Sequence, residues 1–264
     1  MRMLVTGPRG FVGARIMERY PDAVPAPSLR GLDADAVRRL VDTAEPDIII
    51  HTAAMSDIGQ CEKHPEESWR ANVELPLMLA SAGVRCVMFS SDQVYSACPG
   101  TGPYTEEETC PGNLYAREKL EMEQRILDRF PDAVMLRATW MYDMPIYGLQ
   151  NRNNFLMQML KREHMTFSFA QHRAVTYVRE VADQILYAAQ CPGGAYNFGS
   201  ENPLCMLETA ECLRKALNRS VQFEDAGPRH GLWMDCSKAE NAGIHFSDTT
   251  EGFLKCLRDY GLLE

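Results

Sequence analysis

Tyr115 and Lys119 stand four residues apart, inside a helical pattern that extends from Asn113 to Phe130. Side chains at i and i+4 share one face of a helix. The lysine ammonium favours tyrosinate, so it should lower the pKa of the phenol from about 10. A phenol of this kind can give a proton to an oxygen, or take one from it, during hydride transfer. Because Tyr-x-x-x-Lys is common on ordinary helix surfaces, this interpretation needs support from other motifs.

Two hydroxyl residues, Ser90 and Ser91, end the apolar run 87–89 that precedes this pair. A short apolar run is typical of a buried strand. A hydroxyl at the end of such a strand can hold a carbonyl oxygen beside the phenol. A glycine loop near the N-terminus precedes both motifs. This order along the chain favours the catalytic interpretation over that of an ordinary helix surface.

The glycine loop spans residues 7–13 and directly follows a short predicted strand, 3–5. Gly7 permits a tight turn, Gly10 lets the backbone approach a pyrophosphate, and Gly13 lets the following helix pack closely on the sheet. The N-terminus of that helix then presents N–H groups to the phosphates. The loop, including Phe11 and Val12, therefore predicts a dinucleotide site.

The segment after the second predicted strand bears on the choice of dinucleotide. Sites that prefer NAD usually carry an acidic residue there, for the ribose hydroxyl. Residues 26–30 contain no carboxylate, and Arg30 could meet a 2′-phosphate. We therefore expect NADP as the preferred cofactor, with NAD as the alternative. Arg30 is otherwise a solvated loop charge, and Asp33 either reaches the adenine or caps the helix that follows.

Strand and helix alternate over the first 140 residues. Strands are predicted at 3–5, 23–26, 47–51, 84–89 and 133–136, and helices at 12–20, 34–44, 66–82 and 113–130. This alternation predicts an α/β protein with a Rossmann-type, doubly wound parallel sheet. Residues 1–140, with returning segments near 170–200, should form the NAD(P)-binding domain. Helices near 154–162, 178–189 and 207–217, with a strand near 196–198, predict a smaller α/β substrate lobe, mainly 141–264, closing over the carboxyl edge of the sheet.

Composition excludes several classes of function. The formal net charge of the 264 residues is -9, which argues against a nucleic-acid partner. No stretch approaches the ~20 apolar residues of a membrane span. The nine cysteines, of which Cys86, Cys212 and Cys256 are examples, predict reduced, buried thiols in a cytoplasmic protein. The histidines lack ligand spacing, so no metal is expected; a homodimer is left open.

These motifs together resemble the extended short-chain dehydrogenase/reductase family. Within it, the chain is most similar to the dTDP-4-dehydrorhamnose reductases. The resemblance runs through residues 6–13, 46–54, 90–95, 104–107, 115–119 with Glu123, and 136–140. It implies a Rossmann-type domain, a C-terminal substrate lobe, and reduction of a 4-keto nucleotide sugar by NAD(P)H.

The resemblance also implies roles for matching residues. Ser91 would orient the keto oxygen, Tyr115 would donate its proton, and Lys119 would hold the nicotinamide ribose and tune the tyrosine. The remaining matches are to the cofactor cleft (Ala53, Ala54), to a helix asparagine that anchors the catalytic geometry (Asn72), and to the substrate (Asp92, Trp140, Asn154). Asn72 is alternatively a polar residue turned to solvent, and Trp140 a core residue.

Other features separate the relatives. Gln93 stands where the related 4,6-dehydratases place the second member of an acid/base pair, and an amide cannot act as a general base. The reductases often place Gln where Phe11 stands, and a Gly-x-Pro-Thr segment where this chain has 173–176. Two alternatives to the reductase remain: a nucleotide-sugar epimerase, and a non-catalytic NADP-binding protein like the regulatory subunit of methionine adenosyltransferase.

Overall fold

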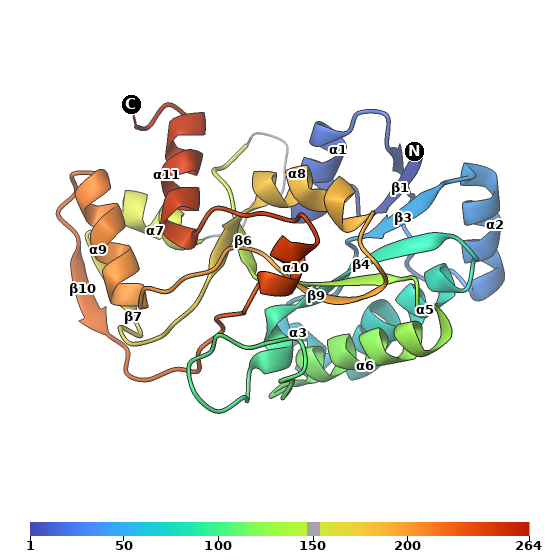
Figure 1. Cartoon of the computed structure of the whole chain (residues 1–264), viewed down its shortest axis with the longest axis horizontal. Helices are drawn as coiled ribbons and strands as arrows, with labels where there is room; N and C mark the ends of the chain where they lie inside the picture. The colour runs from blue at the N-terminus through green and yellow to red at the C-terminus, as the bar shows by residue number, and fades with distance from the viewer. Residues whose placement is uncertain (147–153, 264) are drawn as a thin grey trace.

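A six-stranded parallel sheet forms the centre of the computed structural model, which describes residues 1–146 and 154–263 (Figure 1). Its strand order is β2-β1-β3-β4-β5-β9. The strands are β1 (Met3–Thr6), β2 (Val24–Pro25), β3 (Ile48–His51), β4 (Arg85–Ser91), β5 (Val134–Ala138) and β9 (Gly194–Phe198). The order reverses direction between β1 and β3, as in a doubly wound fold, which confirms the predicted fold class.

The sheet is buried on both faces, which explains its continuous apolar strands. In β3, Ile48 and Ile50 face one helix layer, whereas Ile49 faces the other. The first layer holds α1 (Phe11–Arg19) and α8 (Val178–Ala188), and the second holds α2 (Ala34–Ala44), α5 (Leu75–Ala80) and α6 (Leu114–Arg129). Figure 1 shows α1 and α8 on one side of the sheet and α5 and α6 on the other.

The helix predicted over 66–82 is built from three segments. They are α4 (Pro65–Trp69), a π-helical turn (Arg70–Glu74) and α5, and they follow the short helix α3 (Ile58–Lys63). Pro76 has no N–H to donate to the carbonyl of Asn72, four residues earlier, so a regular α-helix cannot continue through this point. The wider turn places Asn72 in the interior, at a kind of distortion that often marks functional sites.

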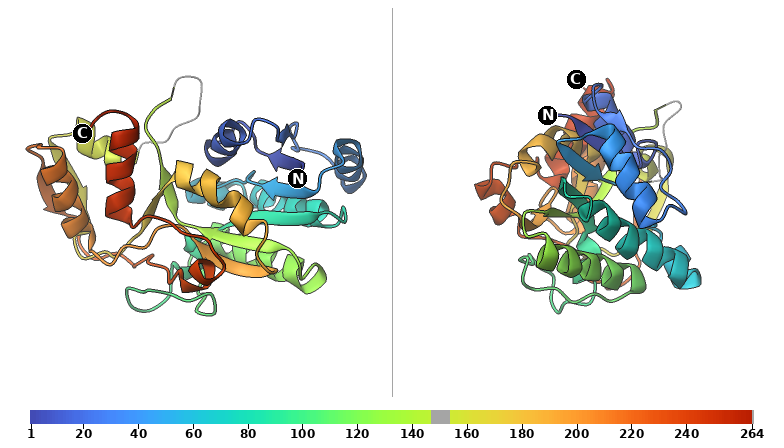
Figure 2. Two further views of the ribbon diagram at one scale, coloured as in Figure 1. Left: turned by 45° about the horizontal axis from the view of Figure 1, so that its top comes forward. Right: turned by 90° about the vertical axis from the view of Figure 1, so that its right-hand side faces the viewer.

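The second part of the molecule is a smaller lobe at one end of the sheet. Its strands pair as β6 (Trp140–Tyr142) with β8 (Val175–Tyr177), and as β7 (His164–Phe167) with β10 (Gln222–Asp225). Helices α7 (Phe155–Lys161), α9 (Met206–Ala216) and α11 (Thr249–Asp259) cover them, and α10 (Ser237–Asn241) lies against β9. In Figures 1 and 2, α9 and α11 lie at the end of the molecule opposite to α2. An aromatic core with Tyr142, Tyr177 and Phe253 holds the lobe together.

Three local predictions are refined by the structure. β4 ends two residues later than predicted, so Ser90 and Ser91 belong to the strand itself. The strand near 196–198 returns to the central sheet as β9. Every cysteine is a free thiol, but Cys212 on α9 and Cys110 are exposed, so the prediction of buried thiols is wrong at both. Helical periodicity places a residue on a helix, but not always on its inner face.

Within the described residues, no helix is both long and apolar enough to cross a membrane. The same part of the chain contains no group of three or more His, Cys, Asp or Glu side chains arranged to hold a metal ion.

Candidate active site

The glycine loop joins β1 to α1 and has the close backbone packing that its spacing predicts. Gly7 has φ of +64°, in the left-handed region that favours glycine. A Cβ on Gly13 would lie 2.2 Å from the carbonyl oxygen of Gly7, so no side chain fits there. Gly10 precedes α1 and brings no capping side chain. The first turn of α1 therefore presents backbone N–H groups to an anionic ligand.

A cleft of about 1470 Å³ opens beside this loop. Of the predicted cofactor residues, Gly7, Gly10, Arg30, Ala53 and Ala54 line it. The others lie outside its lining: Phe11, Val12 and Gly13 form the first turn of α1, and Asp33 accepts a hydrogen bond from the Ala36 N–H at the start of α2. The cleft thus extends from the glycine loop to the segment after β2, where the adenosine end of a dinucleotide would lie.

Positive charge without ion-pair partners lines this cleft. Arg9, Arg30 and Arg70 all contribute to it and are exposed. Within the described ranges, none of the three joins an ion pair. Arg70 comes from the π-helical turn and donates to the Leu32 carbonyl at 3.4 Å. The cleft therefore suits an anion, although Glu67 also lines it.

The catalytic candidates meet at the carboxyl end of β4. Ser91 is the last residue of that strand, and Nζ of Lys119 donates to the carbonyl of Phe89, two residues earlier, at 2.8 Å. The same Nζ lies 5.8 Å from the centroid of the Tyr115 ring. All three side chains are buried. The structure therefore brings Lys119 next to the Tyr115 ring and onto the strand that ends in Ser91, and all three residues lie outside the lining of the cleft described above.

Burial sets the charge state of this group. Desolvation lowers the pKa of Lys119 from 10.5 to about 8, although Glu123 and Glu118 act in the opposite direction. His51, at the end of β3, is also buried, and desolvation with the charge of Lys119 lowers its pKa to about 3. Near neutral pH the site therefore holds an ammonium group on Lys119 and an uncharged imidazole on His51.

Asn72 connects the π-helical turn to α6. Its Oδ1 accepts from the N–H of Met55, and its Nδ2 donates to the Met55 carbonyl, both at 3.0 Å. Nδ2 also donates to Oε2 of Glu118 at 2.9 Å. Asn72 is completely buried, so the alternative of a solvent-facing residue is wrong. Since Glu118 precedes Lys119, this contact helps to fix the start of α6.

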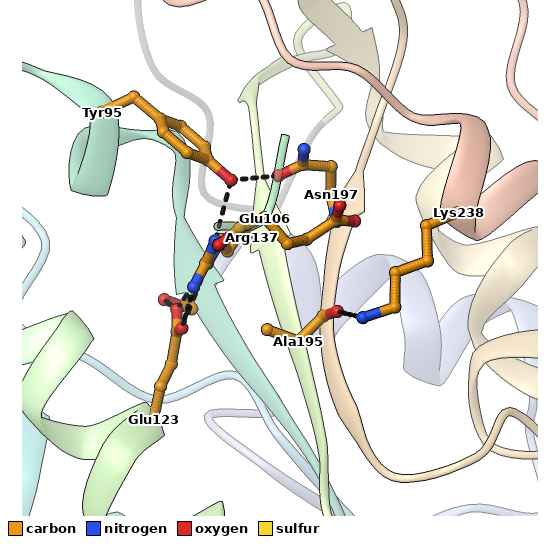
Figure 3. A network of polar contacts seen from close by, with 8 residues as sticks. Tyr95, Glu106, Glu123, Arg137, Ala195, Asn197 and Lys238 are labelled. Atoms are coloured by element: carbon orange, nitrogen blue, oxygen red, sulfur yellow. Dashed lines mark hydrogen bonds and ion pairs between the residues drawn. The ribbon is translucent and has the colours of Figure 1, made fainter. Parts of the chain in front are cut away.

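A second network of polar side chains fixes α6 to the strands of the sheet (Figure 3). Arg137 donates from Nη2 to Oε2 of Glu123 at 2.7 Å, and from Nη1 to the Tyr95 hydroxyl at 2.8 Å. The Tyr95 hydroxyl in turn donates to Oδ1 of Asn197 at 2.6 Å. The hydroxyl of Ser90 donates to Glu123, one turn beyond Lys119. The helix that carries Tyr115 and Lys119 is therefore tied to β4, β5 and β9.

Asp92 and Trp140 lie next to this group, at the carboxyl edge of the sheet. Ser91 of β4 pairs with Ala138 of β5, so Asp92 and Trp140 follow the ends of two neighbouring strands. Asp92 is buried and its Oδ1 lies 3.2 Å from the Ser91 hydroxyl. Trp140 is 36% exposed, so the alternative that it is a core residue is wrong. The guanidinium of Arg173 lies over its ring, 4.8 Å from the centroid.

Asn154 has a structural position at the start of α7. Its Oδ1 accepts from the N–H of Met157 at 2.9 Å, and its Nδ2 donates to the carbonyl of Asp143 at 3.0 Å. The side chain is 2% exposed. These contacts describe a helix cap, and the role in substrate binding that the resemblance implied stays a prediction.

Several residues of the site were not found from the sequence. They are His51, Arg70, Glu118, Arg137, Arg173 and Asn197. Arg137 and Asn197 lie on apolar strands, where a polar residue is an anomaly that could have been noticed. Arg70 and Arg173 carried no such signal, because an isolated arginine in a polar segment is ordinary.

Comparisons with known proteins place this architecture among its relatives. The dTDP-4-dehydrorhamnose reductase of Burkholderia thailandensis is 31% identical, over 71% of this chain and 65% of that protein. Methionine adenosyltransferase 2 subunit beta of Xenopus tropicalis is 28% identical, over 92% of this chain and 83% of that protein. The structure of a Bacillus anthracis dTDP-4-dehydrorhamnose reductase in complex with NADP aligns with a TM-score of 0.82 at 20% identity, covering 98% of this chain and 99% of that one. A family model described as the RmlD substrate binding domain matches residues 1–230, and the chain belongs to that family.

Proposed function

We propose that this protein is an NADPH-dependent reductase of a 4-keto nucleotide sugar. The observation that carries the proposal is the position of Lys119: its ammonium is held on β4 two residues from Ser91 and lies close to the Tyr115 ring. This position supports roles for Ser91 as hydrogen-bond donor, Tyr115 as proton donor and Lys119 as the positive charge beside them.

The residues of the cleft fit a nicotinamide dinucleotide. Any Cβ at Gly13 would meet the backbone of Gly7, so α1 packs closely on the loop, and Gly10 leaves the backbone open to a close approach of phosphates. We assign residues 1–140, with segments near 170–200, to dinucleotide binding and 141–264 mainly to substrate binding. Arg9, Arg30 and Arg70 line the cleft and support NADP over NAD, because a 2′-phosphate adds negative charge that guanidinium groups can bind. The dinucleotide, when bound, supplies the hydride.

The chain's own residues handle the oxygen of the ketone. Ser91 donates a hydrogen bond to it, which orients the carbonyl. As negative charge develops there, Tyr115 transfers its phenolic proton to the oxygen, giving the alcohol. Lys119 then stabilises the phenolate that remains, in a buried setting where this attraction is stronger than in water. Gln93 offers no base, which supports reduction over dehydration.

Turnover tests this proposal directly. NADPH oxidation is followed with dTDP-4-dehydrorhamnose as the substrate, and Tyr115→Phe should lower kcat by about 10²-fold or more, because a positioned proton donor is lost. NADPH binding should survive, because the ring is kept. Tyr187→Phe is the matched control, since Tyr187 is exposed on α8. Normal turnover of Tyr115→Phe would refute the assigned proton donor.

A second candidate is a non-catalytic, NADP-binding regulatory protein. The similarity to methionine adenosyltransferase 2 subunit beta, over 92% of this chain, favours it. The retained Ser91, Tyr115 and Lys119 favour the reductase. A protein that binds NADPH tightly, yet oxidises none of it with dTDP-4-dehydrorhamnose or related keto sugars, would support this second function.

A further inference from the structure

Arg173 brings an unpaired positive charge to the edge of the candidate active site. Its Nε is covered by protein and has no hydrogen-bond partner among the described residues. The backbone is fixed on two sides, because the Arg173 carbonyl accepts from Asn202 at 2.9 Å and the residue bridges to Leu232. Stacking over Trp140 then sets the direction of the guanidinium. The side chain is thus placed by packing rather than by an anionic partner.

Asp92 is the matching acceptor. It is 3% exposed, and its Oδ2 has no hydrogen-bond partner in the part of the chain that the structure describes. Burial raises the pKa of this carboxyl, and the charge of Arg173 opposes that rise. The two groups are therefore near enough to feel each other's charge, yet no direct ion pair joins them. A buried donor and a buried acceptor both lack a partner beside Ser91.

The chemistry of Arg173 and Asp92 limits which ligand group could form hydrogen bonds with both residues. An arginine only donates hydrogen bonds, whereas an ionised carboxylate only accepts them. An anionic ligand group would be repelled by Asp92, and a cationic one by Arg173. A hydroxyl group both donates and accepts, so a neutral hydroxyl can bond to the two residues at once. Leaving buried polar groups unsatisfied costs free energy, which such a ligand would recover.

We propose that Arg173 is a specificity-determining residue that, together with Asp92, binds the substrate hydroxyl adjacent to the reacting carbonyl. The proposal rests on the proposed function and specifies its substrate as an α-hydroxy ketone. Asp92 also contacts the Ser91 hydroxyl through Oδ1, at 3.2 Å. A sugar hydroxyl held by Asp92 would therefore lie next to the carbonyl that Ser91 orients.

Two substrates and two arginine variants test this inference. The substrates are dTDP-4-dehydrorhamnose and its analogue without the hydroxyl on the neighbouring C3 carbon. Arg173→Met keeps an unbranched side chain over Trp140 and removes the charge. We expect kcat/KM for the hydroxylated substrate to fall about 10- to 100-fold, as for loss of a hydrogen bond to a charged group, and kcat/KM for the analogue to change little. Arg173→Lys should restore part of the preference, and the Kd for NADPH should not move.

Arg229→Met is the matched control, because Arg229 is an exposed neighbouring arginine whose charge acts on Arg173. It should leave the preference for the hydroxyl intact. Equal losses for both substrates in Arg173→Met would overturn the inference while the proposed function stands. If Arg173→Met fails to fold, Asp92→Asn replaces it, and a full preference for the hydroxyl in that variant would also overturn the inference.

Wild-type protein that turns over neither substrate would refute the proposed function, and the same comparison is then made by calorimetry with the two nucleotide sugars. A tighter Kd for the hydroxylated one, lost in Arg173→Met, supports the inference. Equal Kd values, or no binding of either, overturn it.

Discussion

The dinucleotide cleft and the catalytic edge are built in opposite ways. The cleft is shaped by backbone, through the contact of Gly13 with Gly7, and is lined by exposed arginines that join no ion pair in the described residues. Beneath the catalytic edge, the charges that hold α6 to the sheet are buried and paired: Glu123 is 2% exposed and Arg137 4%. The dinucleotide cleft therefore depends on glycines that carry no side chain. The buried network depends on the presence of every charged partner.

This difference predicts how each region fails. A backbone-built site should tolerate changes in its polar lining and be destroyed by a single methyl group in the wrong place. A buried network should lose much of its stability when one charge is removed, because the other charge remains without a partner.

The largest effect is expected from Gly13→Val. The new Cβ would lie 2.2 Å from the Gly7 carbonyl oxygen, and backbone cannot move aside as a side chain can. NADPH at 100 times its Kd should raise the stability of the wild type by about 2.7 kcal/mol. In the variant this gain should vanish, as measured by thermal unfolding with and without NADPH.

Gly59→Val is the control for Gly13→Val. A Cβ at this position in α3 would meet only the Asp57 side chain, at 3.4 Å. The variant should keep its response to NADPH. A normal response in Gly13→Val would show that the loop does not bind the dinucleotide.

The next effect is on stability, from Glu123→Gln. The change leaves the Arg137 guanidinium buried without its carboxylate, which should cost about 3–5 kcal/mol of unfolding free energy. Glu121→Gln makes the same change on the same helix in an exposed pair with Arg125, where about 1 kcal/mol or less is expected. Urea unfolding of both variants gives the comparison, and similar losses would contradict the contrast between buried and exposed pairs.

The same contrast explains what the sequence could predict. The Gly7–Gly13 spacing led directly to a loop whose geometry the structure confirms, since glycine reports a local backbone demand. The α/β class, the doubly wound parallel sheet and the position of Tyr115 beside Lys119 also followed from local patterns. The partners of the buried charges did not: Arg137 and Glu123 are 14 residues apart, and Tyr95 and Asn197 are 102 apart. Those pairings depend on which strands neighbour each other.

For some residues the sequence predicted the secondary-structure element but not whether the side chain is buried. Asn72 was expected on a helix, and its burial came from the π-helical turn before Pro76. Cys212 was expected inside and lies outside. A cytoplasmic location and a homodimer stay predictions from the sequence.

Lys119→Met tests the burial of the Lys119 amine through the pH dependence of the unfolding free energy. Burial lowers the pKa of Lys119 to about 8 in the fold, against 10.5 for the free side chain. Between these pH values the unfolded chain binds more protons, so this group makes the wild type more stable as pH rises, by up to ~1.4 kcal/mol per pH unit. Below pH 8 both states carry the proton and the contribution is constant.

The measurement for Lys119→Met is urea unfolding of the cofactor-free protein at about pH 7 and about pH 9.5. The wild type should gain stability relative to the variant over this interval, while turnover of the variant is reduced at both values. A constant difference between the two proteins would show that the amine is not desolvated as its burial indicates.

The smallest effect is expected at the exposed end of the cleft, from Arg30→Ala. If Arg30 contacts a 2′-phosphate, the Kd for NADPH should rise about tenfold, as for one charge-assisted hydrogen bond, and the Kd for NADH should change little. The loss is limited because Arg9 and Arg70 line the same cleft and can share the charge. Added salt should reduce the difference between wild type and variant, since an exposed pair is screened. Arg38→Ala, an exposed arginine on α2 outside the lining of the cleft, is the control. Equal losses for NADPH and NADH would assign Arg30 to the shared part of the dinucleotide, and no loss for either would leave it a solvated loop charge.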